Sequence, residues 1–323
     1  MTTKEERMAL SPYLNILLPF LSGFGIFLYG IYLLGETLQT LAGAKLKSWL
    51  EKATDSPYKG AVIGTVLTAI LHSSSGTTAL TISLVRAGLM TFSSSIGIIL
   101  GANIGTTFTS LLTGLNIALL APLMLSGSAL IIFLTKSERT KQLAKVFFGF
   151  SLLFIGMELI DQGLSQVAGS DRFQSLLLSF TDRPYVSLLV GTVLTALIQS
   201  STLAIGILQT VYANGLIDFR SALPLIFGSN IGTTISLEIF AATGSVEAKR
   251  TALFQVLFNA LGALLFMILF NPFYGLMLHL IETFSLCPKM SIAIAHFLFN
   301  LLTALMAIGF TREMERFMKR LIP

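Results

Sequence analysis

Charged residues and cysteine are both scarce in this chain of 323 residues. Only 11% of the residues are charged, whereas about 25% is typical of a soluble globular domain. So few charges cannot cover an ordinary water-exposed surface, and 54% of the chain is hydrophobic. A lipid bilayer is the simplest surrounding for such a chain, because it removes the need for a charged exterior.

Cys287 is the only cysteine, which excludes an internal disulfide framework and a cysteine-based metal site. The net charge is +5, which in a soluble protein would suggest binding to nucleic acid. Here Lys and Arg lie in short clusters between apolar segments, as the positive-inside bias of membrane proteins requires. We therefore expect a lipid bilayer, and no nucleic acid, as the partner.

Long apolar segments follow one another along the whole chain. Most are long enough to cross a hydrocarbon core of about 30 Å at about 1.5 Å per residue. They cover residues 12–41, 60–86, 92–114, 116–134, 143–165, 184–213, 219–243, 250–270 and 290–310, with a shorter one at 273–286. No linker is long enough to mark a second domain, so we predict a single all-α polytopic transmembrane domain over residues 1–323.

An internal repeat is the strongest feature of the sequence. When the chain is shifted by 127 residues, Gly64–Ala69 lies over the identical hexapeptide Gly191–Ala196, and polar residues align on both sides of it. Similar apolar composition alone would not align polar residues in this way. We predict repeat 1 at about 12–134 and repeat 2 at about 143–270, followed by extra C-terminal helices at about 273–310.

The first polar motif interrupts an apolar segment in each repeat. Its two copies are His72, Ser73, Ser74 and Ser75, and Gln199, Ser200, Ser201 and Thr202. About 11 apolar residues precede the first copy, which places the motif near mid-membrane. Four consecutive polar residues point all around a helix, so one neighbouring helix cannot satisfy them. We predict a broken helix whose free N–H groups bind an anion, while oxygens nearby bind sodium.

The second polar motif reads Gly-x-Asn-Ile-Gly-Thr-Thr and spans residues 101–107 and 228–234. Its glycines permit local unwinding, and Asn and Thr supply neutral oxygens and donors. The candidate binding residues are Asn103, Thr106, Thr107, Asn230, Thr233 and Thr234. Small residues in membrane helices also serve plain helix packing. Two motifs kept at identical spacing in both repeats favour a binding site.

Three further polar residues give weaker signals. Glu238 follows the second motif of repeat 2 by one helical turn and is a candidate cation ligand. Its counterpart in repeat 1 is Leu111, so a role outside the site is an equal alternative. Gln255 and His296 each lie four residues before an asparagine on one helix face, where packing and site roles both stay open.

These motifs resemble the type II sodium/phosphate cotransporter family, which is marked by duplicated Gln-Ser-Ser-Ser segments, Gly-x-Asn-Ile-Gly-Thr runs and later His-x-x-Phe-Asn elements. The resemblance covers roughly residues 20–310. It implies sodium-coupled uptake of inorganic phosphate by alternating access, with sodium as the co-transported ion, no organic cofactor and no enzymatic activity. It also implies that the two Ser-rich segments form the substrate and sodium site, with the Asn and Thr residues of the second motif beside it.

The sequence departs from the family pattern at two motif positions. His72 stands where the family usually has Gln, and only His titrates near neutral pH, which leaves proton coupling open. Thr202 replaces the last Ser and keeps the hydroxyl. Many bacterial relatives add a soluble PhoU-like tail, which we do not expect because this chain ends shortly after Phe310. We expect a bacterial inner (plasma) membrane location, and leave a homodimer and the ion stoichiometry open.

The positions of Lys and Arg bear on the topology. If 60–86 and 184–213 are re-entrant hairpins, each repeat crosses three times, and most of the 21 Lys and Arg lie on one side of the membrane. If every segment crosses, the basic residues divide more evenly. The positive-inside rule therefore favours two inverted repeats with re-entrant hairpins or broken helices, the C-terminus in the cytoplasm and the N-terminus outside.

Two other functions are open to the same sequence. A cation-coupled transporter of another small anion, such as sulfate or a dicarboxylate, would use the same scaffold. An intramembrane serine hydrolase would use His72 as the base for Ser75, but the two lie on one short segment, which is poor geometry. The second copy of the motif also lacks His. No Lys or Arg lies beside the motifs, so bound sodium must help to offset the charge of phosphate.

Overall fold

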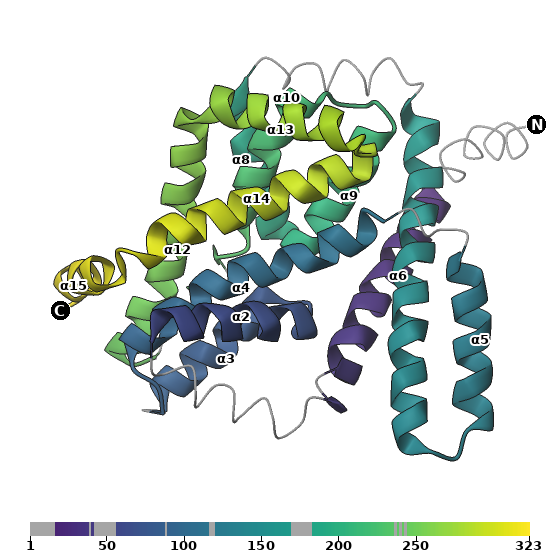
Figure 1. Cartoon of the computed structure of the whole chain (residues 1–323), viewed down its shortest axis with the longest axis horizontal. Helices are drawn as coiled ribbons and strands as arrows, with labels where there is room; N and C mark the ends of the chain where they lie inside the picture. Colours follow the sequence, from purple (N-terminus) through teal and green to yellow (C-terminus); the bar gives the residue numbers. More distant parts are fainter. Residues whose placement is uncertain are drawn as a thin grey trace, which may run out of the picture.

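The computed structural model describes residues 17–38, 40, 41, 56–87, 89–115, 120–168, 183–235, 238, 241 and 244–323. Every regular element in these ranges is a helix, so the predicted all-α class is confirmed (Figure 1). Five of the described helices are long and apolar enough to cross a membrane. They are Leu17–Leu38, Phe92–Thr113, Glu138–Gly163, Val246–Ile268 and Pro288–Ile308.

The two repeats contain the same order of helices. Repeat 1 holds Leu17–Leu38, α2 (Pro57–Leu71), α3 (Ser74–Arg86), α4 (Phe92–Thr113) and α5 (Ala121–Leu134). Repeat 2 holds α6 (Glu138–Ala168), α8 (Pro184–Ile198), α9 (Ser201–Ala213), α10 (Phe219–Gly232) and α12 (Val246–Ile268). The bounds of α8 and α9 are those of α2 and α3 shifted by 127 residues, which is the sequence repeat. After them come α13 (Phe270–Phe284), α14 (Pro288–Ile308) and α15 (Thr311–Leu321).

Equivalent residues start equivalent helices in the two repeats. Pro57 and Pro184 begin α2 and α8, where proline loses no hydrogen bond and its fixed φ suits the helix. Thr91 caps α4, because its hydroxyl accepts a hydrogen bond from the Ser94 N–H at 3.2 Å. Asp218 caps α10 by accepting from the Ser221 N–H at 2.7 Å. The duplicated start signals explain why the helix bounds repeat.

The first helices of the two repeats run antiparallel and in close contact. A methyl group on Gly23 would lie 2.6 Å from the carbonyl oxygen of Gly156, and one on Gly30 would lie 2.9 Å from that of Gly149. Residue numbers therefore rise along Leu17–Leu38 as they fall along α6. Because these helices occupy the same place in their repeats, the repeats are inverted, as the sequence predicts.

The glycines of the second motif hold each broken element against the helix that follows it. A methyl group on Gly101 would overlap the carbonyl oxygen of Ala61 in α2, and one on Gly228 would overlap that of Leu188 in α8. The predicted unwinding is wrong for residues 101–107, because α4 continues through them. In repeat 2, α10 ends within the motif, at Gly232. These glycines serve close helix packing, as small residues do in membrane helices.

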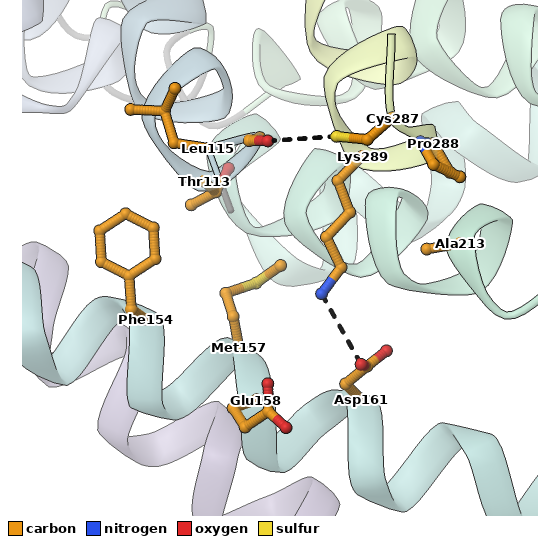
Figure 2. Close-up of a pocket in the computed structure, with 11 residues that line it drawn as sticks. Thr113, Leu115, Phe154, Met157, Glu158, Asp161, Ala213, Cys287, Pro288 and Lys289 are labelled. Atoms are coloured by element: carbon orange, nitrogen blue, oxygen red, sulfur yellow. Dashed lines mark hydrogen bonds and ion pairs between the residues drawn. The ribbon is translucent and has the colours of Figure 1, made fainter. Parts of the chain in front are cut away.

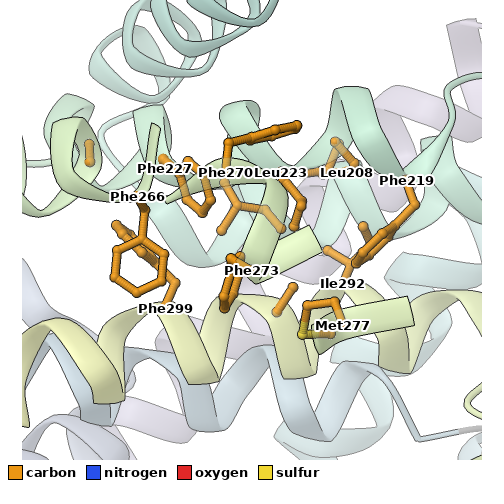
Figure 3. Packing of buried hydrophobic residues seen from close by; sticks show 14 of the residues in the cluster. Leu208, Phe219, Leu223, Phe227, Phe266, Phe270, Phe273, Met277, Ile292 and Phe299 are labelled. Atoms are coloured by element: carbon orange, nitrogen blue, oxygen red, sulfur yellow. The ribbon is translucent and has the colours of Figure 1, made fainter. Parts of the chain in front are cut away.

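The C-terminal helices complete the core around repeat 2. Phe299 of α14 lies 4.7 Å from Phe227 of α10 and 5.0 Å from Phe266 of α12, between ring centroids, and Phe273 of α13 packs edge-on against Phe266 (Figure 3). Figure 1 shows α14 and α4 crossing the middle of the molecule, where they are in contact. α14 therefore links the aromatic core of repeat 2 to repeat 1.

The short helix α15 was not predicted, because it follows the last apolar segment, which ends at residue 310. It lies at one end of the molecule in Figure 1, against α4 and α12. The hydroxyl of Ser93 donates to the carboxylate of Glu315 at 2.8 Å, and Nε of Arg250 donates to the carbonyl oxygen of Ile322 at 2.9 Å. The outer face of α15 is charged, so a search of the sequence for apolar runs does not detect this helix.

Candidate functional site

Both Ser-rich motifs are broken helices, as predicted. His72 ends α2 in the left-handed conformation, with φ 51° and ψ 26°, and Gln199 ends α8 with φ 57° and ψ 24°. A non-glycine residue pays about 1–2 kcal/mol for this conformation. Two helices broken by the same unfavourable geometry at equivalent positions indicate a shared requirement for the break.

A serine caps the new helix directly after each break. The hydroxyl of Ser73 accepts a hydrogen bond from the Gly76 N–H at 3.0 Å, and that of Ser200 accepts from the Leu203 N–H at 3.3 Å. Ser74 and Ser201 are therefore the first residues of α3 and α9. The start of a helix carries unpaired N–H groups and the positive end of the helix dipole, both of which favour an anion.

The structure brings the two broken tips together around one small cavity, which we call the motif cavity. Its volume is about 30 Å³, enough for one or two water molecules. It is lined by His72, Ser73, Ser74, Ser75, Thr106, Gln199, Ser200, Ser201, Thr202 and Thr233. Each of these was singled out from the sequence. Residues far apart in the chain thus meet where the repeats face each other.

Four of the predicted residues lie outside this lining. Asn103 donates from Nδ2 to the carbonyl oxygen of Ile99, and Thr107 donates to that of Ile104. Thr234 donates in the same way to Ile231. These bonds stay within one helix, so the side chains serve α4 and the end of α10. The fourth residue, Asn230, has a longer-range partner.

Asn230 joins α10 to α14. Its Nδ2 donates to Oδ1 of Asn300 at 2.6 Å, and its backbone carbonyl accepts from the Thr233 hydroxyl at 2.8 Å. Thr233 itself lines the motif cavity. Asn230 therefore lies directly behind the cavity wall. Its Oδ1 has no hydrogen-bond partner in the part of the chain that the structure describes.

Thr106 is the repeat 1 residue that faces the cavity from α4. It is buried, and its hydroxyl has no hydrogen-bond partner among the described residues. Its repeat 2 counterpart, Thr233, also lines the cavity, but its hydroxyl donates to the carbonyl oxygen of Asn230. A free buried hydroxyl beside two helix starts can donate to an anion or offer oxygen to a cation.

His72 is fastened by residues that the sequence did not single out. Its Nδ1 lies 2.7 Å from the Thr109 hydroxyl, and its ring packs edge-on against Phe150 of α6 at 6.3 Å between centroids. No sequence pattern pairs these positions. The ring is thus held by α4 and α6, and its recorded hydrogen bond is not to Ser75. This geometry disfavours the hydrolase dyad.

Uncharged polar residues line the motif cavity. Among the described residues that line it, none is Lys, Arg, Asp or Glu. Within the described ranges, no group of three or more His, Cys, Asp or Glu could hold a metal ion. Hydroxyl and carbonyl oxygens are the ligands that suit sodium. The available chemistry is therefore hydrogen bonding to an anion together with weak oxygen ligation of a hard monovalent cation.

The three weaker candidates lie away from this lining. Oε1 of Glu238 is buried and has no partner among the described residues. Gln255 has an unpartnered Oε1, and its backbone carbonyl accepts from the side chain of Asn259. His296 bonds to the hydroxyl of Ser110 through Nδ1 at 3.1 Å. None of the three borders the motif cavity.

Comparison with known proteins identifies the family. The model of the Na+/Pi-cotransporter family matches residues 26–162 and, a second time, residues 152–287. The chain belongs to the Na+/Pi-cotransporter family. Each match covers most of one repeat, and the first extends into α6 and the second through α13. Membership of this family agrees with the helices that are long and apolar enough to cross a membrane, as in an integral membrane protein.

Individual relatives extend this result. The uncharacterized protein YqeW of Bacillus subtilis (strain 168) is 35% identical over 95% of this chain and 99% of its own length. The putative inorganic phosphate export protein YjbB of Salmonella typhimurium is 28% identical over 95% of this chain, which spans only 56% of that protein. The sodium-dependent phosphate transport protein 2A of Oryctolagus cuniculus is 43% identical over 58 residues, 18% of this chain and 9% of its own length. No solved structure matches the chain.

Proposed function

We propose that the protein is a secondary active transporter that carries inorganic phosphate together with sodium by alternating access. The observation that supports this most is the meeting of both broken helix tips at one cavity of hydroxyls, amides and helix starts. Membership of the Na+/Pi-cotransporter family supports phosphate as the substrate. The family is a family of transporters, so we propose no enzymatic activity.

Phosphate binds, in this proposal, between the starts of α3 and α9. Ser74 and Ser201 are buried first residues of these helices and line the cavity from opposite repeats. Unpaired N–H groups at both helix starts and the hydroxyl of Thr106 donate to the phosphate oxygens. Because no cationic side chain lines the cavity in the part of the chain that the structure describes, a co-bound cation must offset the charge. This is the physical reason for proposing obligatory sodium coupling.

The small cavity volume fits a closed state of the alternating-access cycle. About 30 Å³ is too little for hydrated phosphate, so the tips must separate for binding and release. Inverted repeats can exchange between two arrangements, so that a site between them opens alternately to each side of the membrane. We propose uptake as the working direction, because an inward sodium gradient drives a co-transported anion inward. A relative is named for phosphate export, which is the opposite direction, so the direction of transport has to be measured.

Radiolabelled phosphate flux in proteoliposomes tests this proposal. An inward sodium gradient should drive phosphate accumulation, and a potassium gradient of the same size should not. An imposed proton gradient without sodium separates the coupling ions: accumulation under it alone would transfer the coupling role to protons and to His72. Excess unlabelled sulfate or dicarboxylate that abolishes uptake would point to another anion. No accumulation under either gradient, in folded and inserted protein, would contradict phosphate transport.

A further inference from the structure

A second and larger cavity opens between the two repeats, and we call it the vestibule. Its volume is about 310 Å³, and its walls come from the end of α4, the middle of α6, the end of α9 and the start of α14 (Figure 2). Glu158, Asp161 and Lys289 bring charge to it. No described residue that lines the motif cavity is charged, so the two spaces differ in both size and polarity.

The vestibule and the motif cavity lie along the same helix faces. Thr106 lines the motif cavity and Thr113 lines the vestibule, and both belong to α4. Seven residues are nearly two turns of helix, so both side chains share one face about 10 Å apart. On α9, Thr202 lines the motif cavity and Ala213 lines the vestibule. Eleven residues are about three turns, so these two also share one face.

Gln209 lies between the two cavities and ties three helices together. It is fully buried on α9, on the face of Thr202. Its Oε1 accepts from the Thr113 hydroxyl at 2.7 Å, and its Nε2 donates to the carbonyl oxygens of Ser110 at 2.8 Å and Lys289 at 3.0 Å. Ser110 lies between the levels of Thr106 and Thr113 on α4. The amide therefore spans the space through which the cavities would join.

The contacts at the outer edge of the vestibule are more exposed than those of Gln209. Nζ of Lys289 lies 3.8 Å from Oδ2 of Asp161, which is longer than a hydrogen bond. Figure 2 draws this ion pair as a dashed line. Asp161 also accepts from Nδ2 of Asn214 at 2.7 Å. Both ionic side chains are partly exposed, so water reaches this edge. Partly exposed contacts at the outer edge and fully buried contacts at Gln209 are the arrangement of an open mouth with a closed inner barrier.

From these contacts we infer that the vestibule is the aqueous route by which substrate reaches the motif cavity from one side of the membrane, and that the amide of Gln209 is the barrier between them. The inference rests on the proposed transport of phosphate for its substrate, a hydrated inorganic oxyanion accompanied by a cation. Gln209 acts as a positioning residue, because it holds α9 against α4 and α14. Its release would let the tip of the second broken helix withdraw from the first.

The single cysteine of the chain provides a direct probe of the route. Cys287 lines the vestibule and is exposed. In proteoliposomes, reaction with the anionic reagent sulfonatoethyl methanethiosulfonate should reduce phosphate flux several-fold. Cys287→Ser, compared with its own untreated flux, should not respond. Complete modification of Cys287, verified by mass spectrometry, with unchanged flux would contradict a route through the vestibule.

A labelling experiment tests the barrier without relying on phosphate transport. Thr106→Cys in a Cys287→Ser background places one thiol in the motif cavity. Adding Gln209→Ala should raise the rate at which this thiol reacts with the same reagent in detergent about tenfold. A factor of ten corresponds to a barrier lower by about 1.4 kcal/mol. Gln255→Ala is the matched control, because Gln255 is equally buried but lies on α12, outside the route.

The two experiments distinguish the possible failures. Equal labelling rates with and without Gln209→Ala, in protein with an unchanged melting temperature, would overturn the barrier. An increase from both Gln209→Ala and Gln255→Ala would also overturn it, because general loosening would then explain access. Faster labelling with Gln209→Ala alone supports the route, even if the wild-type protein carries no phosphate. That last combination would contradict the proposed function and leave the route intact.

Discussion

The two broken helices share their backbone but differ in what holds their tips. Both tips turn through a left-handed residue and restart at a capping serine. In repeat 1 the turning residue is His72, which is buried against Thr109 and Phe150. In repeat 2 it is Gln199, which is exposed and whose side chain has no hydrogen-bond partner among the described residues. The two repeats thus share the geometry of the broken helix, but within the described residues only in repeat 1 does the turning residue hold the tip by side-chain contacts.

A second difference lies within the broken elements themselves. The hydroxyl of Thr68 donates to that of Thr77 at 2.8 Å, which joins α2 to α3. The equivalents are Thr195 and Ala204, so repeat 2 lacks one of the two hydroxyls. The Thr195 hydroxyl is accordingly buried without a partner among the described residues. The comparison indicates a fixed first tip and a more easily displaced second tip, which suits a transporter that moves one element against another.

The largest expected effect tests what the repeats have in common. Gly101→Ala and Gly228→Ala should each lower the free energy of unfolding by about 3 kcal/mol, because the added methyl overlaps backbone. Melting temperatures in detergent measure the effect. Gly127→Ala is the control, since nothing lies within 4 Å of the added methyl. A large loss of stability from only one of these two substitutions would show that the two repeats are not packed equivalently.

Truncation of the turning residues should separate the repeats. His72→Ala removes a buried ring and its bond to Thr109, and should cost about 2 kcal/mol of unfolding free energy. Gln199→Ala removes an exposed side chain and should change stability by less than about 0.5 kcal/mol. Thermal unfolding of both variants provides the comparison. Equal losses would contradict the assignment of repeat 1 as the fixed tip.

Exchange of the hydroxyl pair should shift stability in opposite directions. Thr77→Ala strands the buried hydroxyl of Thr68 and should cost about 1–2 kcal/mol. Ala204→Thr gives Thr195 a partner and should gain up to about 1 kcal/mol. The gain should also slow phosphate flux, since it fastens the tip that we expect to move. Unchanged flux in a stabilised Ala204→Thr protein would argue against that motion.

The smallest expected effect concerns α15, outside both tips. Burial alone would raise the pKa of Glu315, but hydrogen bonds from Lys319 and Ser93 and the charge of Lys319 lower this pKa below its ordinary value. A lowered pKa stabilises the docked helix above the ordinary Glu range, and the contribution is lost as the pH falls through the lowered pKa. The protection of the α15 amides against hydrogen exchange, measured relative to the intrinsic exchange rate at each pH, should therefore fall below about pH 4. Glu315→Gln should remove this dependence, and Glu313→Gln, on the exposed face, should keep it.

The sequence predicted the broken helices and their motifs better than it predicted the contacts around them. A polar run such as Ser73–Ser75 inside an apolar segment can be accommodated in only a few ways. The broken helix and its second copy could therefore be predicted from the sequence. The prediction of unwinding at the glycines failed because a glycine such as Gly101 is compatible with both unwinding and close helix packing. Only the nearby Ala61 in the folded structure shows that Gly101 serves close packing. The bond from His72 to Thr109 joins positions with no shared pattern. The vestibule was not foreseen, since it forms between helix ends that only the tertiary fold brings together.

Equilibrium binding of radiolabelled phosphate to the purified protein, with and without sodium, tests most directly whether the paired tips form the binding site. We expect sodium to increase binding to the wild-type protein, and Ser74→Ala or Ser201→Ala to abolish that increase without loss of folding. Ser83→Ala, which changes a hydroxyl bonded to the Ala79 carbonyl on the same helix as Ser74, should bind as the wild type does. Wild-type binding by both tip variants would contradict the site.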